Sequence, residues 1–205
     1  MAVGNGYMQY SLQLVAVREV LASIYMNPGY PDDFFTGYVE DVGPRHFLIA
    51  DATPWGHLEG WRVLRTGAAL QIVVDEEYER RLDGLIEHYG EKHMRFFTQP
   101  LGEEDLLYRV LDKCRREKRV ISLMVGEDVI VGRVSEVNEL RTRLNAMSFF
   151  GADAGVEQVS LREIDMVCID TQEERMYETL ERMKGGTQLR LLREDGQSDG
   201  APDDV

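Results

Sequence analysis

An internal repeat constrains the fold of this chain more than any other feature. Residues 36–88 align with residues 131–183 at a constant offset of 95 positions and without a gap, and nine of the 53 aligned positions are identical. The identities fall at turns, at alternating apolar positions and at one helix start, as duplication of a folded unit predicts. They are Gly37/Gly132, Val39/Val134, Val42/Val137, Gly56/Gly151, Gly60/Gly155, Asp75/Asp170, Glu79/Glu174, Arg80/Arg175 and Leu85/Leu180.

Each copy is predicted to contain a helix, five short strands and a second helix. Apolar residues at three- and four-residue spacing predict the opening helices at 11–19 and 103–118. Alternating β-branched and aromatic residues predict strands at 20–26, 34–42, 47–50, 61–64 and 69–74, and again at 120–125, 129–137, 141–147, 156–161 and 164–169. We expect Asp75 and Asp170 to cap the closing helices. VLASIYM aligns with VISLMVG at an offset of 100, which predicts five extra residues in the first copy.

An aromatic residue followed by Gly, three residues and a second Gly occurs once in each copy. The two segments are WGHLEG, starting at Trp55, and FGADAG, starting at Phe150. Each joins the third strand to the fourth, where glycine permits a sharp turn. We expect the aromatic rings to cover the open ends of small barrels; the alternative is that these loops also line a binding site.

These elements predict a mainly β protein with flanking helices. The expected architecture is two tandem five-stranded barrels, each with an N-terminal and a C-terminal helix. The first copy spans 7–97 and the second 103–184, and the segment 98–105, TQPLGEED, links them. We expect residues 185–205 to form a flexible acidic tail, because the last twelve residues carry five acids and no base.

The strand regions of both copies resemble the Sm-like fold of bacterial Hfq and its relatives, a small SH3-like barrel. The resemblance rests on FTGYVEDV in the first copy and on RREKRVISLMV followed by DVIVGRVSEVNEL in the second. It implies a non-catalytic, RNA-binding protein whose copies assemble through exposed edge strands. It also implies a pocket at the loop between strands two and three, here residues 43–47 and 138–142, with Arg65 or Arg162 in place of the family's second basic motif.

The sequence departs from the family where that pocket uses a polar pair. Gly43 and Phe47 stand at these positions in the first copy, and Asn138 and Thr142 in the second. The segment KCRREKR lies where the resemblance implies a basic rim that touches RNA. The candidate RNA-binding residues are therefore Lys113, Arg115, Arg116, Lys118, Arg119, Arg141 and Asn138. The alternative is a solvated helix face whose charges pair with the acid-rich helices of the neighbouring copy.

Charge and composition limit the function. The formal net charge is −14, and −9 remains once the acidic last twelve residues are set aside, which argues against broad binding to phosphate backbones. No segment has the length and apolarity of a membrane span, and no signal peptide is evident, so we expect a cytoplasmic protein without a membrane partner. Cys114 and Cys168 lack metal-site spacing and are expected to be buried thiols.

No motif predicts catalysis, a metal or another cofactor. His88 and His93 are spaced too irregularly to share a helix face as metal ligands, and no nucleophile motif accompanies the histidines. We therefore expect a non-catalytic binding protein. RNA or a ribonucleoprotein is the first expected partner, together with further copies of this chain. The alternative is a protein-interaction or scaffolding module of SH3-like barrels that binds no nucleic acid. A more remote alternative is a small-molecule sensor with a pocket between the two copies.

Overall fold

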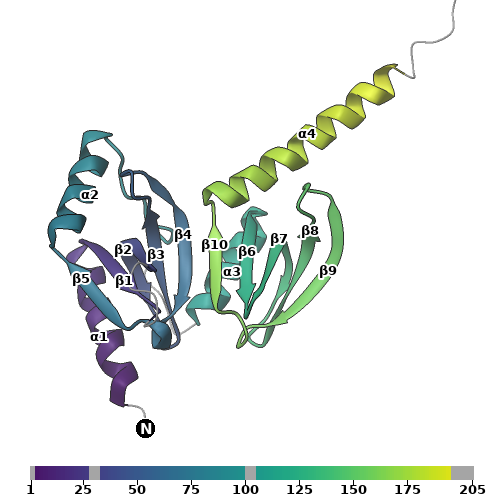
Figure 1. Ribbon diagram of the computed structural model, residues 1–205. Helices are drawn as coiled ribbons and strands as arrows, with labels where there is room; N and C mark the ends of the chain where they lie inside the picture. The colour runs from purple at the N-terminus through teal and green to yellow at the C-terminus, as the bar shows by residue number, and fades with distance from the viewer. Residues whose placement is uncertain (1–2, 28–32, 100–104, 195–205) are drawn as a thin grey trace, which may run out of the picture.

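In the described part of the chain, alternating apolar residues form ten strands, and four α-helices flank them (Figure 1). The computed structural model describes residues 3–27, 33–99 and 105–194. The first half contains α1 (Val3–Arg18), β1 (Leu21–Tyr25), β2 (Phe34–Val42), β3 (His46–Ala52), β4 (Leu58–Arg65), a 3-10 turn η1 (Thr66–Ala68), β5 (Gln71–Val74) and α2 (Glu77–His88). The second contains α3 (Leu106–Glu117), β6 (Val120–Val125), β7 (Asp128–Val137), β8 (Arg141–Met147), β9 (Asp153–Ser160), β10 (Met166–Ile169) and α4 (Gln172–Glu194).

The strands form one continuous antiparallel sheet rather than two closed barrels. Their order is β5-β1-β2-β3-β4-β10-β6-β7-β8-β9. The expectation of two separate five-stranded barrels is therefore wrong. The edge of β4 pairs with β10 of the other half, from Met166 opposite Leu64 to Ile169 opposite Trp61. This pairing satisfies backbone groups on β4 and β10 that would otherwise form free edges, and it leaves β5 and β9 at the two ends of the sheet.

Two of the repeated glycines allow the second strand of each half to bend closely over the third. A Cβ on Gly37 would lie 2.0 Å from the carbonyl oxygen of Ala50, and one on Gly132 would lie 2.3 Å from that of Asn145. The strand register shifts just beyond each glycine, between Val39 and Asp41 and at the matching point of β7. Glycine is required here because a side chain would collide with backbone, which cannot move aside.

The pairing of these glycines corrects the alignment of the first strands. Gly37 pairs with Ala22, and Gly132 pairs with Ile121, so the offset is 99 and the first copy carries four extra residues rather than five. The corrected offset equates Ser23 with Ser122. Each serine lies next to a buried, repeated glutamate of the closing helix, since Ser23 Oγ is 2.5 Å from Glu79 Oε1 and Ser122 Oγ hydrogen-bonds Glu174.

The repeated aspartates precede the helix caps instead of acting as caps. The N-cap of α2 is Glu76, and Asp75 and Asp170 have φ angles of 58° and 55°. Asp75 forms an ion pair of 2.9 Å with Arg18. Asp170 pairs in the same way with Arg119. These left-handed aspartates therefore connect the closing helix of each half to the segment before its first strand.

The glycine after each exposed aromatic residue packs against the closing helix. A Cβ on Gly56 would lie 2.4 Å from that of Leu85, and a Cβ on Gly151 would lie 2.9 Å from that of Leu180. The adjacent Trp55 is 73% exposed, and its counterpart Phe150 is 69% exposed. The expectation that these rings cover the end of a barrel is wrong, because the glycines hold them at the surface.

The largest apolar core crosses from one half to the other. It combines Leu48 of β3 and Val63 of β4 with α3 and with all five strands of the second half. Helix α3 supplies Leu106, Leu107, Val110, Leu111 and Cys114, all of them at most 1% exposed. A separate cluster under α1 contains Leu12 and Val15. Helix α3 therefore covers the junction as well as its own half.

The segment after α2 is fixed to the first half by a buried carboxylate. Glu40 accepts hydrogen bonds of 2.9 Å from Trp61 Nε1, 2.9 Å from His93 Nε2 and 2.7 Å from the backbone nitrogen of Phe96. Phe96 then packs in the core beside α3. This network holds the segment after α2 against the first half, where Phe96 reaches the core beneath α3.

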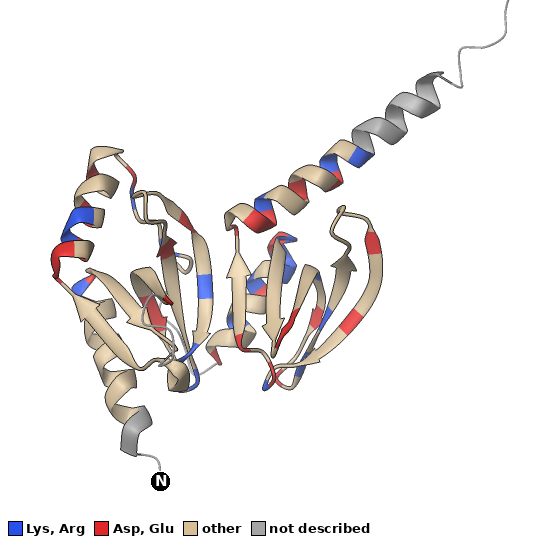
Figure 2. Ribbon diagram, in the orientation of Figure 1, with Lys and Arg blue, Asp and Glu red and all other residues tan. Residues whose placement is uncertain are grey.

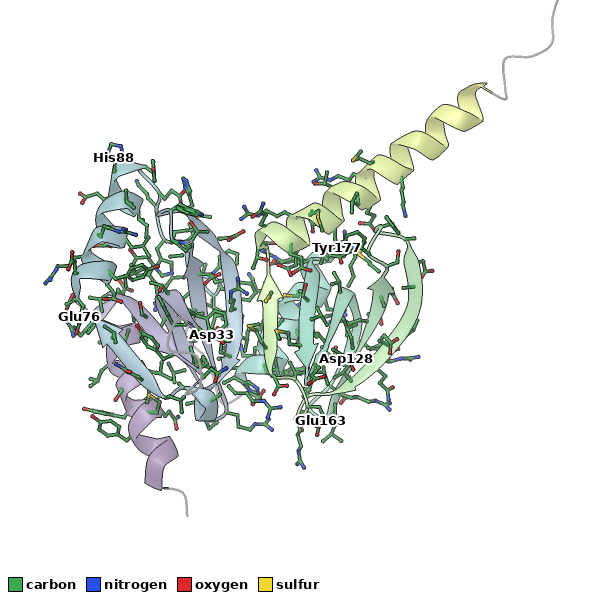
Figure 3. The ribbon with its side chains drawn as sticks, viewed as in Figure 1. Asp33, Glu76, His88, Asp128, Glu163 and Tyr177 are labelled. Carbon is green, nitrogen blue, oxygen red and sulfur yellow. The ribbon has the colours of Figure 1, made fainter. Side chains whose placement is uncertain are left out.

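The remaining boundaries concern the linker and the tail. Residues 100–104 of the predicted linker, and 195–205 of the predicted tail, lie outside the described residues. The backbone of α4 continues to Glu194, and the helix projects away from the sheet beyond Tyr177, the residue labelled at its base (Figures 1 and 3). None of the helices in the described part of the chain is long and apolar enough to cross a membrane.

We predict that Gly60→Ala opens the β4–β10 junction. The new Cβ would lie 2.1 Å from the backbone oxygen of Ile169, and φ at Gly60 is +64°. We expect a loss of roughly 2–4 kcal/mol in the free energy of unfolding, measured with urea. Cys168 lies buried on β10 opposite Arg62, and burial raises the pKa of its thiol to about 11. Opening the junction would expose this thiol, so a thiol-specific reagent should modify Cys168 faster in the variant than in the wild type. Gly84→Ala is the control, because nothing lies within 4 Å of its Cβ position; equal effects would contradict the prediction.

Candidate functional site

The basic run predicted to bind RNA lies on α3 and at the start of β6, where acids accompany it. Lys113 pairs with Glu117 at 2.9 Å, and both Arg115 and Arg116 pair with Asp112, at 2.8 and 3.0 Å. Arg119 pairs with Glu117 and Asp170. Figure 2 shows blue and red positions close together around the start of β6. The charges of this run are thus largely balanced by acids of its own half, not of the neighbouring copy.

Two cations of this run also lie over aromatic rings. The Lys113 ammonium is 5.2 Å from the centroid of the Phe96 ring, and the Arg119 guanidinium is 5.6 Å from that of Trp61. Lys118 adopts a left-handed conformation at the end of α3, with φ of 54°. These contacts give Lys113 and Arg119 a role in packing α3 against the junction.

Asn138 and Arg141 lie apart in the chain, at the turn between β7 and β8. The side-chain oxygen of Asn138 accepts hydrogen bonds from the backbone nitrogens of Leu140 and Arg141, at 2.9 and 3.1 Å. This oxygen closes the turn, which is a common use of Asn in a hairpin. The fold brings together the five bases from Lys113 to Arg119 and places Asn138 and Arg141 on a different element.

A cavity of about 610 Å³ lies at the base of the junction between the two halves. Three segments line it: the turn before β3, the end of β4 with η1, and the turn between β9 and β10. Glu163, labelled in Figure 3, marks the last of these turns at the base of the second half. The lining residues are Pro44, Arg45, His46, Arg65, Gly67, Ala68, Arg162 and Asp165. The volume falls within the usual range of small-ligand sites.

Arg65 holds the two walls of this cavity together. Its Nε donates to the carbonyl oxygen of Ile164 at 3.0 Å, and its terminal nitrogen donates to that of Arg162 at 2.6 Å. It also pairs with Asp165 at 3.1 Å. A residue of the first half is thereby fixed to the turn of the second, which positions the side chain of Arg162 at the rim.

The other two arginines differ in how far they are neutralised. Arg45 forms an ion pair of 3.0 Å with Asp105, the N-cap of α3. Arg162 is exposed and has no ion pair within the described part of the chain. The lining contains three arginines and one aspartate, so the cavity carries a local positive charge in an acidic protein.

His46 is the buried polar group of the cavity. It is 5% exposed, and its Nδ1 is buried without a hydrogen-bond partner among the residues that the structure describes. Burial lowers the pKa of His46 from 6.5 to about 4, because the charged imidazolium is poorly solvated there, while the carboxylate of Asp105 opposes this shift. The ring is therefore neutral at pH 7. An unpaired buried nitrogen costs free energy until a ligand or water pairs with it.

The arrangement can bind an anion and one further polar group. Arginine side chains provide several donors that match phosphate or carboxylate oxygens. The sequence identified Arg65 and Arg162 through the Sm-like resemblance, and it placed residues 43–47 at a pocket. It did not single out Arg45 and His46, since only the fold shows that they face a turn of the other half. Their proximity in sequence to Gly43 was the one available signal.

Comparison of the chain with protein-family models, with curated proteins and with solved structures finds no match. Among the described residues, no group of three or more His, Cys, Asp or Glu side chains is placed to hold a metal ion. The cavity is thus described by its own geometry and charge.

We predict that His46→Gln changes how stability depends on pH. Between pH 6.5 and about 4 the unfolded wild-type chain binds a proton at His46 that the folded chain does not bind. The wild type should therefore lose up to about 1.4 kcal/mol of stability per pH unit in this window as pH falls, and the variant should lack this contribution. Urea unfolding of both proteins from pH 8 to pH 4 measures the difference. Parallel stability curves would show that residue 46 does not titrate in this way.

Proposed function

We propose that this chain is a non-catalytic binding protein that takes a short segment of single-stranded RNA in the junction cavity. The observation that carries the proposal is that Arg45, Arg65 and Arg162, from two halves, line one cavity together with the buried His46. Arginines would contact phosphate oxygens, and a base or ribose would donate an N–H or O–H to Nδ1. The Sm-like resemblance, which remains a prediction, supports the same class of ligand.

The charge balance of the chain limits this binding to a few phosphates. Affinity for long nucleic acids grows with the number of phosphates that Lys and Arg neutralise. The net charge is −14, and the bases of α3 are paired with Asp112 and Glu117. The cavity has room for about one nucleotide with its adjoining phosphates. We infer that the affinity for RNA depends only weakly on salt concentration. The chain would recognise a short segment and would not bind along the whole length of an RNA.

We predict that Arg162→Glu weakens binding of a short, fluorescently labelled oligouridylate by about 10-fold or more. Replacing the unpaired arginine by an acid removes a charge-assisted contact and adds repulsion. Fluorescence anisotropy measures the dissociation constant. Arg116→Glu is the matched control, because its side chain is 64% exposed and lies on α3 outside the cavity. Loss of binding only in Arg116→Glu would move the site to the basic run, and no binding by the wild type would refute the proposal.

A second candidate function is protein interaction, favoured by the exposed aromatic residues. Trp55 is 73% exposed, and Phe149 and Phe150 are 70% and 69% exposed, at equivalent loops of the two halves. Aromatic residues of this kind are common anchors of protein interfaces. The rings of Phe149 and Phe150 contact each other at 5.4 Å between centroids, and glycines fix both loops on helices.

We predict that a Trp55→Ala, Phe150→Ala variant loses any protein partner retained from nuclease-treated extract, while it keeps the affinity of the wild type for RNA. The aromatic loops are separate from the residues of the cavity. Val129→Ala, which changes a residue 53% exposed, is the control for general loss of apolar surface. Retention of the same partner by the double variant would reject this candidate function.

A further inference from the structure

We propose that copies of this chain join head to tail, with β9 of one copy paired antiparallel to β5 of the next. This inference goes beyond the proposed ligand and does not depend on it. The two strands that pair at the junction, β4 and β10, have counterparts at an offset of 95 in β9 and β5. These counterparts are the two end strands of the sheet. Each end of the molecule therefore carries the complement of the other.

The junction inside the chain fixes the register between copies. Ile169 lies opposite Trp61, and Met166 lies opposite Leu64. Transfer by the repeat offset places Val74 of one copy opposite Val156 of the next, and Gln71 opposite Val159. The same contact can repeat at every free end, so it is a heterologous interface that extends or closes into a ring.

Gly155 provides an observation that the isolated chain does not explain. At the junction, a Cβ on Gly60 would collide with Ile169 and Asp170, so glycine is needed there. Its counterpart Gly155 has φ of +96° and nothing within 4 Å of its Cβ position. In the proposed register, Val74 and Asp75 of the next copy would occupy the place that Ile169 and Asp170 take beside Gly60. Glycine at 155 then has the same use as at 60.

Apolar side chains are exposed at both ends where the junction buries or covers their counterparts. Leu106 of α3 is 1% exposed and lies against Gly43 of the other half, whereas its counterpart on α1, Tyr7, is 73% exposed. At the other end, Val156 is 58% exposed, and its counterpart is the partly buried Trp61. The counterparts of Leu48 and Val63, which pack with α3 at the junction, are Arg143 and Gln158. The head therefore exposes an apolar ring, whereas the tail combines Val156 with polar side chains.

A second copy is the occupant because only it presents both complements at the right spacing. A partner strand of another protein would satisfy one edge of the sheet, but it would not supply an α1 equivalent beside that strand. At the junction, α3 and β10 contact the first half together. In the proposed contact, α1 and β5 of the next copy would meet β8 and β9 in the same way.

The test uses light scattering after size-exclusion chromatography on the full chain over a range of concentrations. We expect the wild type to form oligomers whose mass is a whole multiple of that of the monomer. Val125 and Asp128 flank a two-residue turn and form a hydrogen-bonded pair. Met124 and Ser122 therefore point to β10, and the N–H groups of Met166 and Cys168 point back to β6. Their counterparts Gln71 and Val73 face β1 in the same way, so the N–H of Val74 points to the free edge. Val74→Pro should therefore remove the head contact without disturbing the β1 ladder. Val156→Asp should remove the tail contact.

Mixing these variants distinguishes a head-to-tail contact from other associations. Each variant should be a monomer alone, and a mixture should form a heterodimer and nothing larger, because one intact head and one intact tail remain. Val129→Asp, at a residue 53% exposed on an inner strand, should assemble like the wild type. A wild type that is monomeric at all concentrations overturns the proposal. An oligomer that Val156→Asp leaves intact also overturns it.

Cross-linking tests the register separately from the mass. The native thiols Cys114 and Cys168 are buried, so introduced thiols can be oxidised selectively. A Val74→Cys, Val156→Cys chain should form intermolecular disulfides and give a ladder on a non-reducing gel, because residues directly opposite each other have neighbouring Cβ atoms. Gln71→Cys, Val156→Cys should form far fewer. Equal ladders would contradict the proposed register.

Discussion

The pairing of β4 with β10 is the interaction on which the rest of this structure depends. Four residue pairs join these strands, and they turn two five-stranded units into one sheet. The pairing also places Leu48 and Val63 of the first half under α3, so the main core contains residues of both halves. Backbone hydrogen bonds set the register, and burial of apolar surface beneath α3 supplies most of the stabilisation. The junction cavity exists because the same pairing brings turns of the two halves together.

Local features of the fold were predictable because they depend on local chemistry. Period-two alternation located all ten strands, and Gly37 and Gly132 marked the bends of β2 and β7. Whether the strands close into two barrels or form one open sheet was not predictable in this way, because it depends on which strand pairs with the edge of β4. Nothing in the alternation of β4 distinguishes a partner in its own half from β10. The wrong offset of 100 arose because unequal connections hide the register, which becomes clear only when Gly37 and Gly132 are seen to pair with Ala22 and Ile121.

The candidate site shows the same limit at the level of side chains. The basic run from Lys113 to Arg119 was visible as a cluster of like charges, but Asp112 and Asp170 neutralise it in the fold. The cavity gathers residues near positions 45, 65 and 162, which no local pattern connects. The repeat is also uneven here. His46 aligns with Arg141, and Arg162 aligns with Gly67, so the two copies share a fold while only the junction combines an unpaired arginine with a buried imidazole.

The two copies also differ at the strand edges that correspond to each other, which are β4 at the junction and β9 at the end of the sheet. At the junction, Trp61 packs against Phe96 and donates a hydrogen bond to Glu40 of its own half, and Arg119 of the other half lies over its ring. The counterpart of Trp61 at the sheet end is Val156, which has no such contacts and is mostly exposed. An interface that reuses the strand pairing without these polar contacts would be weaker than the junction and hence reversible. In the proposed assembly, copies of the chain would therefore associate through a weaker form of the contact that joins the two halves.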